Sequence, residues 1–141
     1  MRVFSKGVTR IVRRLGRRVG VDPMNGTEAP TVQGALRVDG LYLGVDPDIP
    51  GVVYSNRPTA GGWETAVITE HENQIDCDVY YGDADVRLSV TPAGDFETRP
   101  GNDAPGNWET FSIATQLNGI ILLNAIRDDK LVAVFEVVLK S

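Results

Sequence analysis

The chain has 141 residues, of which 42% are hydrophobic and 23% are charged, which is typical of one soluble globular domain and excludes an intrinsically disordered chain. No apolar run approaches the ~20 residues of a membrane-spanning helix, and the first residues lack the continuous apolar stretch of a secretory signal, so we expect a cytoplasmic protein that acts without export. Cys77 is the single cysteine, which excludes an internal disulfide and a cysteine-based metal site and predicts a buried thiol.

Charge is divided unevenly along the chain. Because the formal net charge is −5 and residues 1–21 contain seven basic residues and no acid, the other 120 residues carry −12. Such a division is typical of an interaction tail joined to a folded module. We therefore predict a basic arm over residues 1–21, a linker of turn-forming residues over 22–31, and a folded body over 32–141.

The arm has the pattern of a short amphipathic helix, with Val8, Ile11, Val12, Leu15 and Val19 on one face. A helix of about 12 residues is marginal alone in water, so we expect it to bind a surface. An acidic protein groove is favoured, because phosphate contacts alone need no apolar stripe; nucleic acid, an anionic membrane and a disordered tail are the alternatives, and the membrane is the least favoured binding partner. The predicted partner-binding residues are Arg2, Lys6, Arg10, Ile11, Arg13, Arg14, Leu15, Arg17 and Arg18.

The body alternates short apolar runs with turn residues, a pattern typical of an all-β sandwich or barrel. Four strands are predicted over Val32–Val38, Leu41–Val45, Val52–Asn56 and Glu64–Thr69. Four more are predicted over Ile75–Tyr81, Val86–Thr91, Asp95–Arg99 and Glu109–Ala114. The last three are predicted over Ile120–Ala125, Leu131–Phe135 and Val137–Lys140.

An internal repeat relates these groups of strands. The segment Gly62-Trp63-Glu64-Thr65 returns 45 residues later as Asn107-Trp108-Glu109-Thr110. At the same offset, Leu41, Leu43 and Val45 fall on Val86, Leu88 and Val90, and then on Leu131, Ala133 and Phe135. The chain thus predicts three copies of one unit, the third of which lacks its Trp-Glu-Thr strand.

Three repeats of about 45 residues with four strands each predict a β-trefoil, a six-stranded barrel closed at one end by three hairpins. The residues Gly40–Leu43, Asn56–Pro58 and the two Trp-Glu-Thr elements resemble the fascin-like, actin-crosslinking branch of β-trefoils from Thr31 onward. That resemblance implies a filament- or carbohydrate-binding module. The missing closing strand predicts an unpaired edge beside the first strand, to be filled by the segment around Val3 and Phe4 or by a neighbouring subunit, and a β-sandwich is the alternative fold.

No catalytic constellation is recognisable, so we expect a protein that is not an enzyme and that needs no cofactor or metal. Carboxylate pairs at Asp46/Asp48, Asp83/Asp85 and Asp128/Asp129 are interpreted as turn residues in preference to acid/base or calcium-binding groups. Glu70, His71 and Glu72 are interpreted as a solvated loop.

Four aromatic residues are candidates for ligand binding: Tyr42, Tyr54, Trp63 and Trp108. The two tryptophans are favoured as rim-packing residues, with Glu64 and Glu109 bound to backbone or arginine. Tyrosines, including Tyr80 and Tyr81, are the better surface candidates.

Two functions follow from these features. The first is a structural protein that docks through its basic arm onto other structural proteins of a larger assembly, such as a capsid-decorating or head-tail accessory protein of a bacteriophage virion. The second is a β-trefoil lectin that binds carbohydrate or a filament.

Overall fold

The computed structural model describes residues 30–140 of the chain. The predicted basic arm and its helix, and all but the last two residues of the predicted linker, lie outside the described residues.

The described body is all-β, with ten strands and two short 3-10 turns. The first five strands are β1 (Thr31–Val38), β2 (Leu41–Val45), β3 (Val53–Arg57), β4 (Thr65–Glu70) and β5 (Asp76–Tyr81). The last five are β6 (Val86–Val90), β7 (Phe96–Pro100), β8 (Phe111–Thr115), β9 (Ile121–Arg127) and β10 (Lys130–Leu139). The 3-10 turns η2 (Gly62–Glu64) and η3 (Asn107–Glu109) occupy the positions where the two Trp-Glu strands were predicted to begin, so β4 and β8 start later than predicted.

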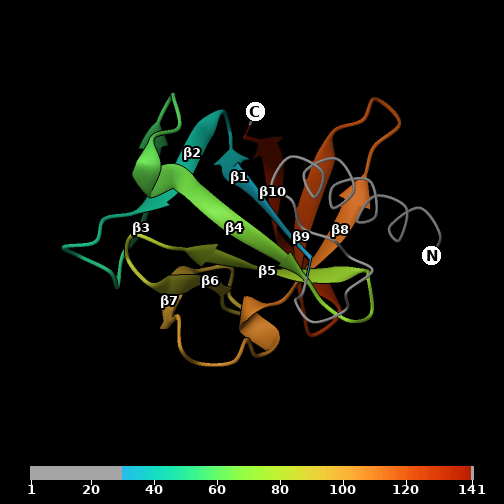
Figure 1. Ribbon diagram of the computed structural model, residues 1–141. Coiled ribbons are helices and arrows are strands. Elements are labelled where there is room, and N and C mark those ends of the chain that lie inside the picture. The colour runs from blue at the N-terminus through green and yellow to red at the C-terminus, as the bar shows by residue number, and fades with distance from the viewer. Residues whose placement is uncertain (1–29, 141) are drawn as a thin grey trace.

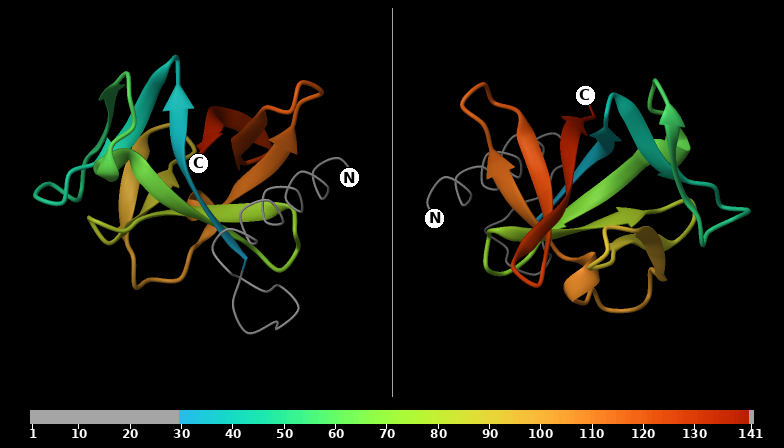
Figure 2. Two further views of the ribbon diagram at one scale, coloured as in Figure 1. Left: turned by 45° about the horizontal axis from the view of Figure 1, so that its top comes forward. Right: turned by 180° about the vertical axis from the view of Figure 1, so that it is seen from behind.

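Six strands close into a ring of antiparallel pairs. Strand β1 pairs with β4, β4 with β5, β5 with β8, β8 with β9, β9 with β10, and β10 with β1. Figure 2 shows the last strand of the chain beside the first, where the ring closes. All ten strands belong to one sheet, which differs from the two packed sheets of the β-sandwich alternative.

Two hairpins extend from this ring. Among the described strands, β3 pairs only with β2, and β7 pairs only with β6, so both are edge strands of the described sheet; the β2–β3 hairpin lies at the left of Figure 1. They are the hairpins predicted for the first and second repeats.

The third repeat differs from its prediction. The two strands predicted over Leu131–Phe135 and Val137–Lys140 form one strand, β10, with a bulge between Leu131 and Ala133. The far half of β10 pairs with β1 from Gly34↔Leu139 to Arg37↔Glu136. The predicted unpaired edge beside the first strand is therefore wrong, because the chain supplies the pairing partner itself.

The interior follows the period-2 alternation of the strands. Leu43, Leu88 and Phe135 are fully buried, and the Phe135 ring packs against Phe96 and edge-on against Phe111 at 5.7 Å between centroids. Buried apolar side chains from all three repeats thus share one core.

The burial of individual residues agrees with prediction at some positions and differs at others. Cys77 is buried as predicted, and burial raises the pKa of its thiol. Leu41 and Leu131, predicted to face the core, are 36% and 59% exposed, because each stands at the turn end of its strand. Tyr81, predicted as a surface candidate, is in the core at 1% exposure.

Aspartates occupy turn positions as predicted. Asp39, Asp85, Asp128 and Asp129 have positive φ angles between 52° and 63°, a conformation that aspartate tolerates better than most residues. The Asp46 side chain accepts a hydrogen bond from the Asp48 backbone N–H at 2.8 Å, which is an Asx turn.

Candidate functional site

The two Trp-Glu-Thr segments form the same local structure around a buried glutamate. In η2, Glu64 Oε1 accepts a hydrogen bond from the Gly61 backbone N–H at 2.7 Å, and in η3, Glu109 Oε1 accepts one from Gly106 at 2.8 Å. The two glutamates are only 4% and 1% exposed. The prediction that they bind backbone is confirmed, and each ties the start of its turn to the end.

The threonine of each segment closes the same turn from the other side. Thr65 Oγ1 donates to the Gly61 carbonyl at 2.9 Å, and Thr110 Oγ1 donates to the Gly106 carbonyl at 2.8 Å. The Trp-Glu-Thr triplet is therefore a turn-forming unit, because glutamate and threonine satisfy both backbone groups of one glycine.

The second carboxylate oxygen of Glu64 is satisfied by a tyrosine. The Tyr54 hydroxyl donates to Glu64 Oε2 in a short hydrogen bond. Burial and this bond raise the pKa of Tyr54, so the phenol remains protonated. Gly44 makes room for the contact, since a Cβ there would lie 2.5 Å from the Tyr54 hydroxyl and 2.8 Å from Glu64 Oε2.

Glu109 is satisfied by other groups. Ser89, one repeat beyond Gly44, donates from Oγ to Glu109 Oε2 at 2.7 Å, and Arg99 Nε lies 3.4 Å from Oε1. The ion pair with arginine joins the backbone contact, as predicted.

A buried arginine also holds η3, through hydrogen bonds to backbone carbonyls of this segment. Arg127 is 6% exposed, and its guanidinium donates to the backbone carbonyls of Trp108, Thr110 and Val90 at 2.7 to 3.0 Å. Burial lowers the pKa of Arg127, and the Glu109 carboxylate acts in the opposite direction. The sequence reading did not single out this residue.

The turns leave both tryptophans at the surface in different surroundings. Trp63 is 39% exposed and Trp108 is 45% exposed, so each tryptophan is partly covered and partly open to solvent. Trp63 lines a hollow of about 280 Å³ with Tyr54, and the other lining residues are Asp46, Ile49, Val52, Asn56 and Arg57. We call this the Trp63 hollow.

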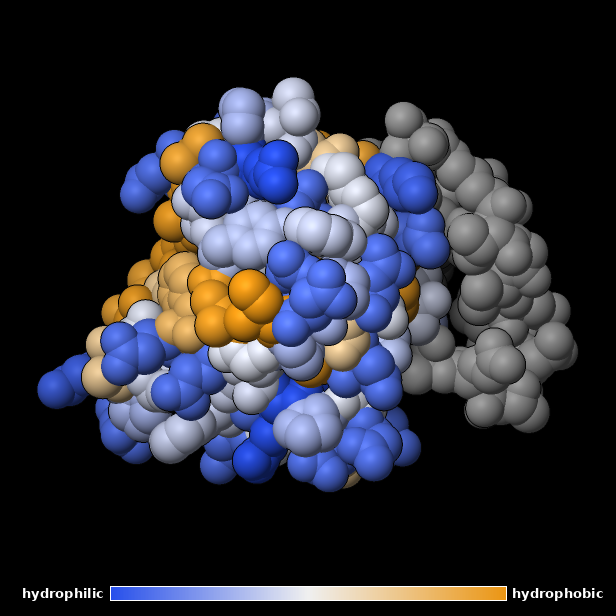
Figure 3. Space-filling model, turned by 90° about the vertical axis from the view of Figure 1, so that its left-hand side faces the viewer, coloured by the Kyte–Doolittle hydropathy of each residue, from blue (hydrophilic) through white to orange (hydrophobic). Residues whose placement is uncertain are grey.

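Both apolar and polar side chains line the Trp63 hollow. Ile49 and Val52 at its rim are 56% and 55% exposed. Figure 3 shows a hydrophobic area on this side of the molecule, which carries the β2–β3 hairpin, surrounded by polar residues. Asp46, Asn56 and Arg57 add an acceptor, an amide and a guanidinium to the same lining.

The other two aromatic candidates lie elsewhere. Trp108 lines a separate hollow of about 310 Å³ beside the β9–β10 turn, with Pro92, Asn107, Ile126, Arg127, Asp128 and Asp129. Tyr42 is half-buried and lies outside both linings, with its ring centroid 5.7 Å from the Arg37 guanidinium carbon. The structure thus brings together Tyr54 and Trp63 but not Tyr42 or Trp108.

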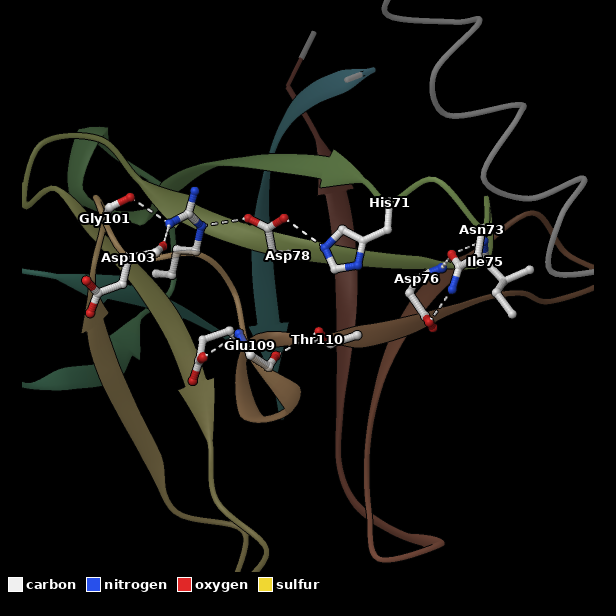
Figure 4. A network of polar contacts seen from close by, with 11 residues as sticks. His71, Asn73, Ile75, Asp76, Asp78, Gly101, Asp103, Glu109 and Thr110 are labelled. Carbon is white, nitrogen blue, oxygen red and sulfur yellow. Dashed lines mark hydrogen bonds and ion pairs between the residues drawn. The ribbon is translucent and has the colours of Figure 1, made fainter. Parts of the chain in front are cut away.

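A further polar network was not predicted. Figure 4 shows the buried Asp78 carboxylate beside His71, with 2.9 Å between Asp78 Oδ1 and His71 Nε2. Arg87 Nε donates to Asp78 Oδ2 at 2.9 Å. Arg87 also donates to the Gly101 carbonyl at 2.6 Å. His71 lies in the loop after β4, as interpreted, but its side chain is half-buried and bonded to Asp78 instead of fully solvated. The 45-residue repeat gave no signal for the network, because its residues belong to neighbouring strands and turns.

A third hollow of about 560 Å³ adjoins this network. Thr69, Glu70, His71, Glu72, Asn73, Pro105, Gly106, Asn107 and Thr110 line it. Burial raises the pKa of Glu70. Within residues 30–140, no group of three or more potential metal ligands converges, and no helix has the length and apolarity to span a membrane.

The nine predicted partner-binding residues of the arm lie outside the described residues. A scan against models of protein families finds no match for this chain, and a search of curated proteins finds no significant relative.

Proposed function

We propose that this chain is a non-enzymatic binding module with a β-trefoil fold whose third repeat lacks its hairpin. The closed ring of six strands supports this assignment, together with hairpins β2–β3 and β6–β7 at corresponding points of the first two repeats. The two η turns, each built on a buried glutamate 45 residues from the other, support it independently. The fascin-like resemblance of the same segments agrees with a binding role.

The ligand that the described surface fits best is a carbohydrate, and the Trp63 hollow carries this proposal. An indole ring packs against the C–H face of a pyranose, while sugar hydroxyls need the donors and acceptors that Asp46, Asn56 and Arg57 supply. The volume of about 280 Å³ suits one or two sugar rings. Tyr54 is held rigidly by Glu64, which lowers the entropic cost of binding.

A glycan array with the full chain tests this function. Trp63→Ala is expected to weaken binding of any captured glycan roughly tenfold or more, because it removes the stacking surface. Trp108→Ala is the matched control, since it removes an equally exposed indole in the second repeat and is expected to retain binding. Absence of glycan capture, or equal loss in both variants, would contradict the proposal.

A second candidate function is docking into a larger assembly through the basic arm, for which the division of charge along the chain is the supporting observation. Seven basic residues in the first 21, on a chain that is otherwise acidic, suit an acidic groove on another structural protein. A virion, in which the chain would be a decorating or head-tail accessory protein, is the proposed setting. Nucleic acid is the alternative partner of the arm.

Substitutions in the arm separate its apolar and electrostatic contributions. Ile11→Asp with Leu15→Asp is expected to abolish co-sedimentation with the particle or filament that copurifies with the protein, because the apolar stripe can no longer be buried. Arg13→Gln with Arg14→Gln should mainly increase the salt sensitivity of co-sedimentation. Equal losses without salt dependence would rule out this division of roles.

A further inference from the structure

Two of the hollows adjoin η3. The larger one is bounded by Glu70 and Glu72, the smaller one by Asp128 and Asp129, and Asn107 lines both. We call the surface formed by these two hollows the η3 trough. Its parts come from the β4–β5 turn, η3 and the β9–β10 turn, which are distant in sequence but adjacent in the fold.

The η3 trough combines negative charge with exposed apolar surface. Within residues 30–140, none of its four carboxylates takes part in an ion pair. Its arginine, Arg127, is buried and directed at backbone carbonyls, so it offers no free cation at the surface. The smaller hollow adds Trp108 at 45% exposure and Ile126 at 49%, and Leu131, paired with Ile126 across the β9–β10 hairpin, is 59% exposed.

This surface complements residues 1–21 in two independent respects. That segment has seven basic residues and no acid, which matches four carboxylates that form no ion pair with the basic residues of the described body. It also carries Val8, Ile11, Val12 and Leu15 at helical spacing, and the exposed Trp108, Ile126 and Leu131 are apolar surfaces against which such a stripe is buried with a gain in free energy.

The described chain begins beside the trough. The Pro30 carbonyl accepts a hydrogen bond from the backbone N–H of Glu70 at 2.9 Å, and Glu70 is part of the trough lining. The eight residues 22–29 span up to about 28 Å when extended, about twice the radius of gyration of roughly 13 Å for a body of this size. A short tether of this kind gives a local concentration of about a millimolar, which favours binding to the same molecule over a second copy.

We propose that residues 1–21 bind the η3 trough of their own body, with arginines on Glu70, Glu72, Asp128 and Asp129 and the apolar stripe against Trp108 and Ile126. The trough is then the intramolecular docking surface of the basic arm. Any external partner of the arm would have to displace it from this surface. Intramolecular docking does not require the carbohydrate site, and its test involves no external partner, so either proposal can fail without the other.

Limited proteolysis of the full chain by trypsin tests this docking, because all the basic residues of the arm are cleavage sites. The test variant carries Glu70→Gln, Glu72→Gln, Asp128→Asn and Asp129→Asn; asparagine is chosen because it tolerates the positive φ of both turn residues. At low salt the arm of the unaltered chain is expected to be cut about fivefold or more slowly than that of the test variant, because cleavage follows the undocked population. High salt should abolish this difference.

A matched control removes the same number of charges from exposed positions outside the trough: Asp39→Asn, Asp48→Asn, Asp95→Asn and Glu97→Gln. The control is expected to keep the slow cleavage of the unaltered chain. Faster cleavage of the control and the test variant alike would overturn the assignment to the trough. The net charge of the body, and not the position of the carboxylates, would then determine the cleavage rate. Identical cleavage of the unaltered chain and the test variant at every salt concentration would overturn docking altogether.

Two further measurements fix the geometry. Cleavage rates independent of protein concentration support binding to the same molecule, whereas protection that grows with concentration would overturn it in favour of exchange between copies.

In a Trp63→Phe background, acrylamide quenching of the remaining Trp108 fluorescence should increase with added salt, and this increase should be absent when the four trough substitutions are also present. An increase of the same size with those substitutions would count against contact between the arm and Trp108.

Discussion

The η2 and η3 regions have the same turn and the same buried glutamate but differ in what satisfies that glutamate. In η2 a tyrosine hydroxyl reaches Glu64 across the space left by Gly44, whereas in η3 the hydroxyl of Ser89 bonds Glu109 directly. A buried carboxylate requires partners, but the chain can supply them from different strands. Both copies of the turn therefore need a hydroxyl donor for their buried glutamate, but residues at different positions of the repeat supply it.

The two tryptophans also differ in what surrounds them. Around Trp63, the bond to Tyr54 places a second aromatic residue in the same hollow. Around Trp108, the neighbouring strand contributes Arg127 and the acidic β9–β10 turn. Two copies of one turn thus present surfaces of different chemistry, which suits two different binding partners.

The strongest way to break the comparison is to remove the buried guanidinium of Arg127, which bonds the backbone carbonyls of the η3 region. Arg127→Met keeps much of the aliphatic packing but leaves the carbonyls of Trp108, Thr110 and Val90 without their donor. We expect the free energy of unfolding to fall by about 3 kcal/mol in urea denaturation of the full chain. Arg57→Met, at an exposed position in the first repeat, is the control and should change it by less than about 0.5 kcal/mol.

Transplanting the η3 arrangement into η2 sharpens the comparison. Gly44→Ser alone should destabilise the chain by about 1–3 kcal/mol, because its Cβ would clash with Tyr54. Tyr54→Val alone should cost about 1–3 kcal/mol, because Glu64 loses its hydroxyl donor. In the double variant, the introduced serine hydroxyl can replace the lost tyrosine donor. The free energy of unfolding should therefore fall by at least about 1 kcal/mol less than the sum of the two single changes. Simple additivity in the double-mutant cycle would show that the two arrangements are not interchangeable.

The smallest effects are expected where the two regions agree. Thr65→Val and Thr110→Val each remove one side-chain hydrogen bond to a glycine carbonyl while keeping shape. Each should lower the free energy of unfolding by about 1 kcal/mol, and by nearly equal amounts. A difference above about 1 kcal/mol between them would mean that the two turns are not energetically equivalent.

Prediction from the sequence succeeded where a residue's role depends on its neighbours along the chain. Alternation placed Leu43 and Leu88 in the core, and turn chemistry placed aspartates in turns, where several have positive φ. The same reasoning took Leu131 for a core residue, because it does not detect that this position lies at the turn end of β10, ahead of a bulge.

The candidate sites were less accessible to sequence reasoning. The repeat identified Trp63 and Trp108 as equivalent, yet their surroundings come from segments that only folding brings near, such as the β9–β10 turn beside Trp108. A buried arginine such as Arg127 has no local signature, since its partners are backbone carbonyls of other strands.

Closure of the ring by β1 and β10 joins segments about a hundred residues apart, as the contact of Arg37 with Glu136 illustrates. Pairing over such a sequence separation is slow, because a large loop must be ordered before any stabilising contact forms. During synthesis, β1 therefore lacks its β10 partner until residues 130–139 have been made. Loss of even the last few residues of β10 would leave this edge of β1 permanently open to other chains, so the protein is expected to tolerate changes in its turns far better than shortening of its final strand.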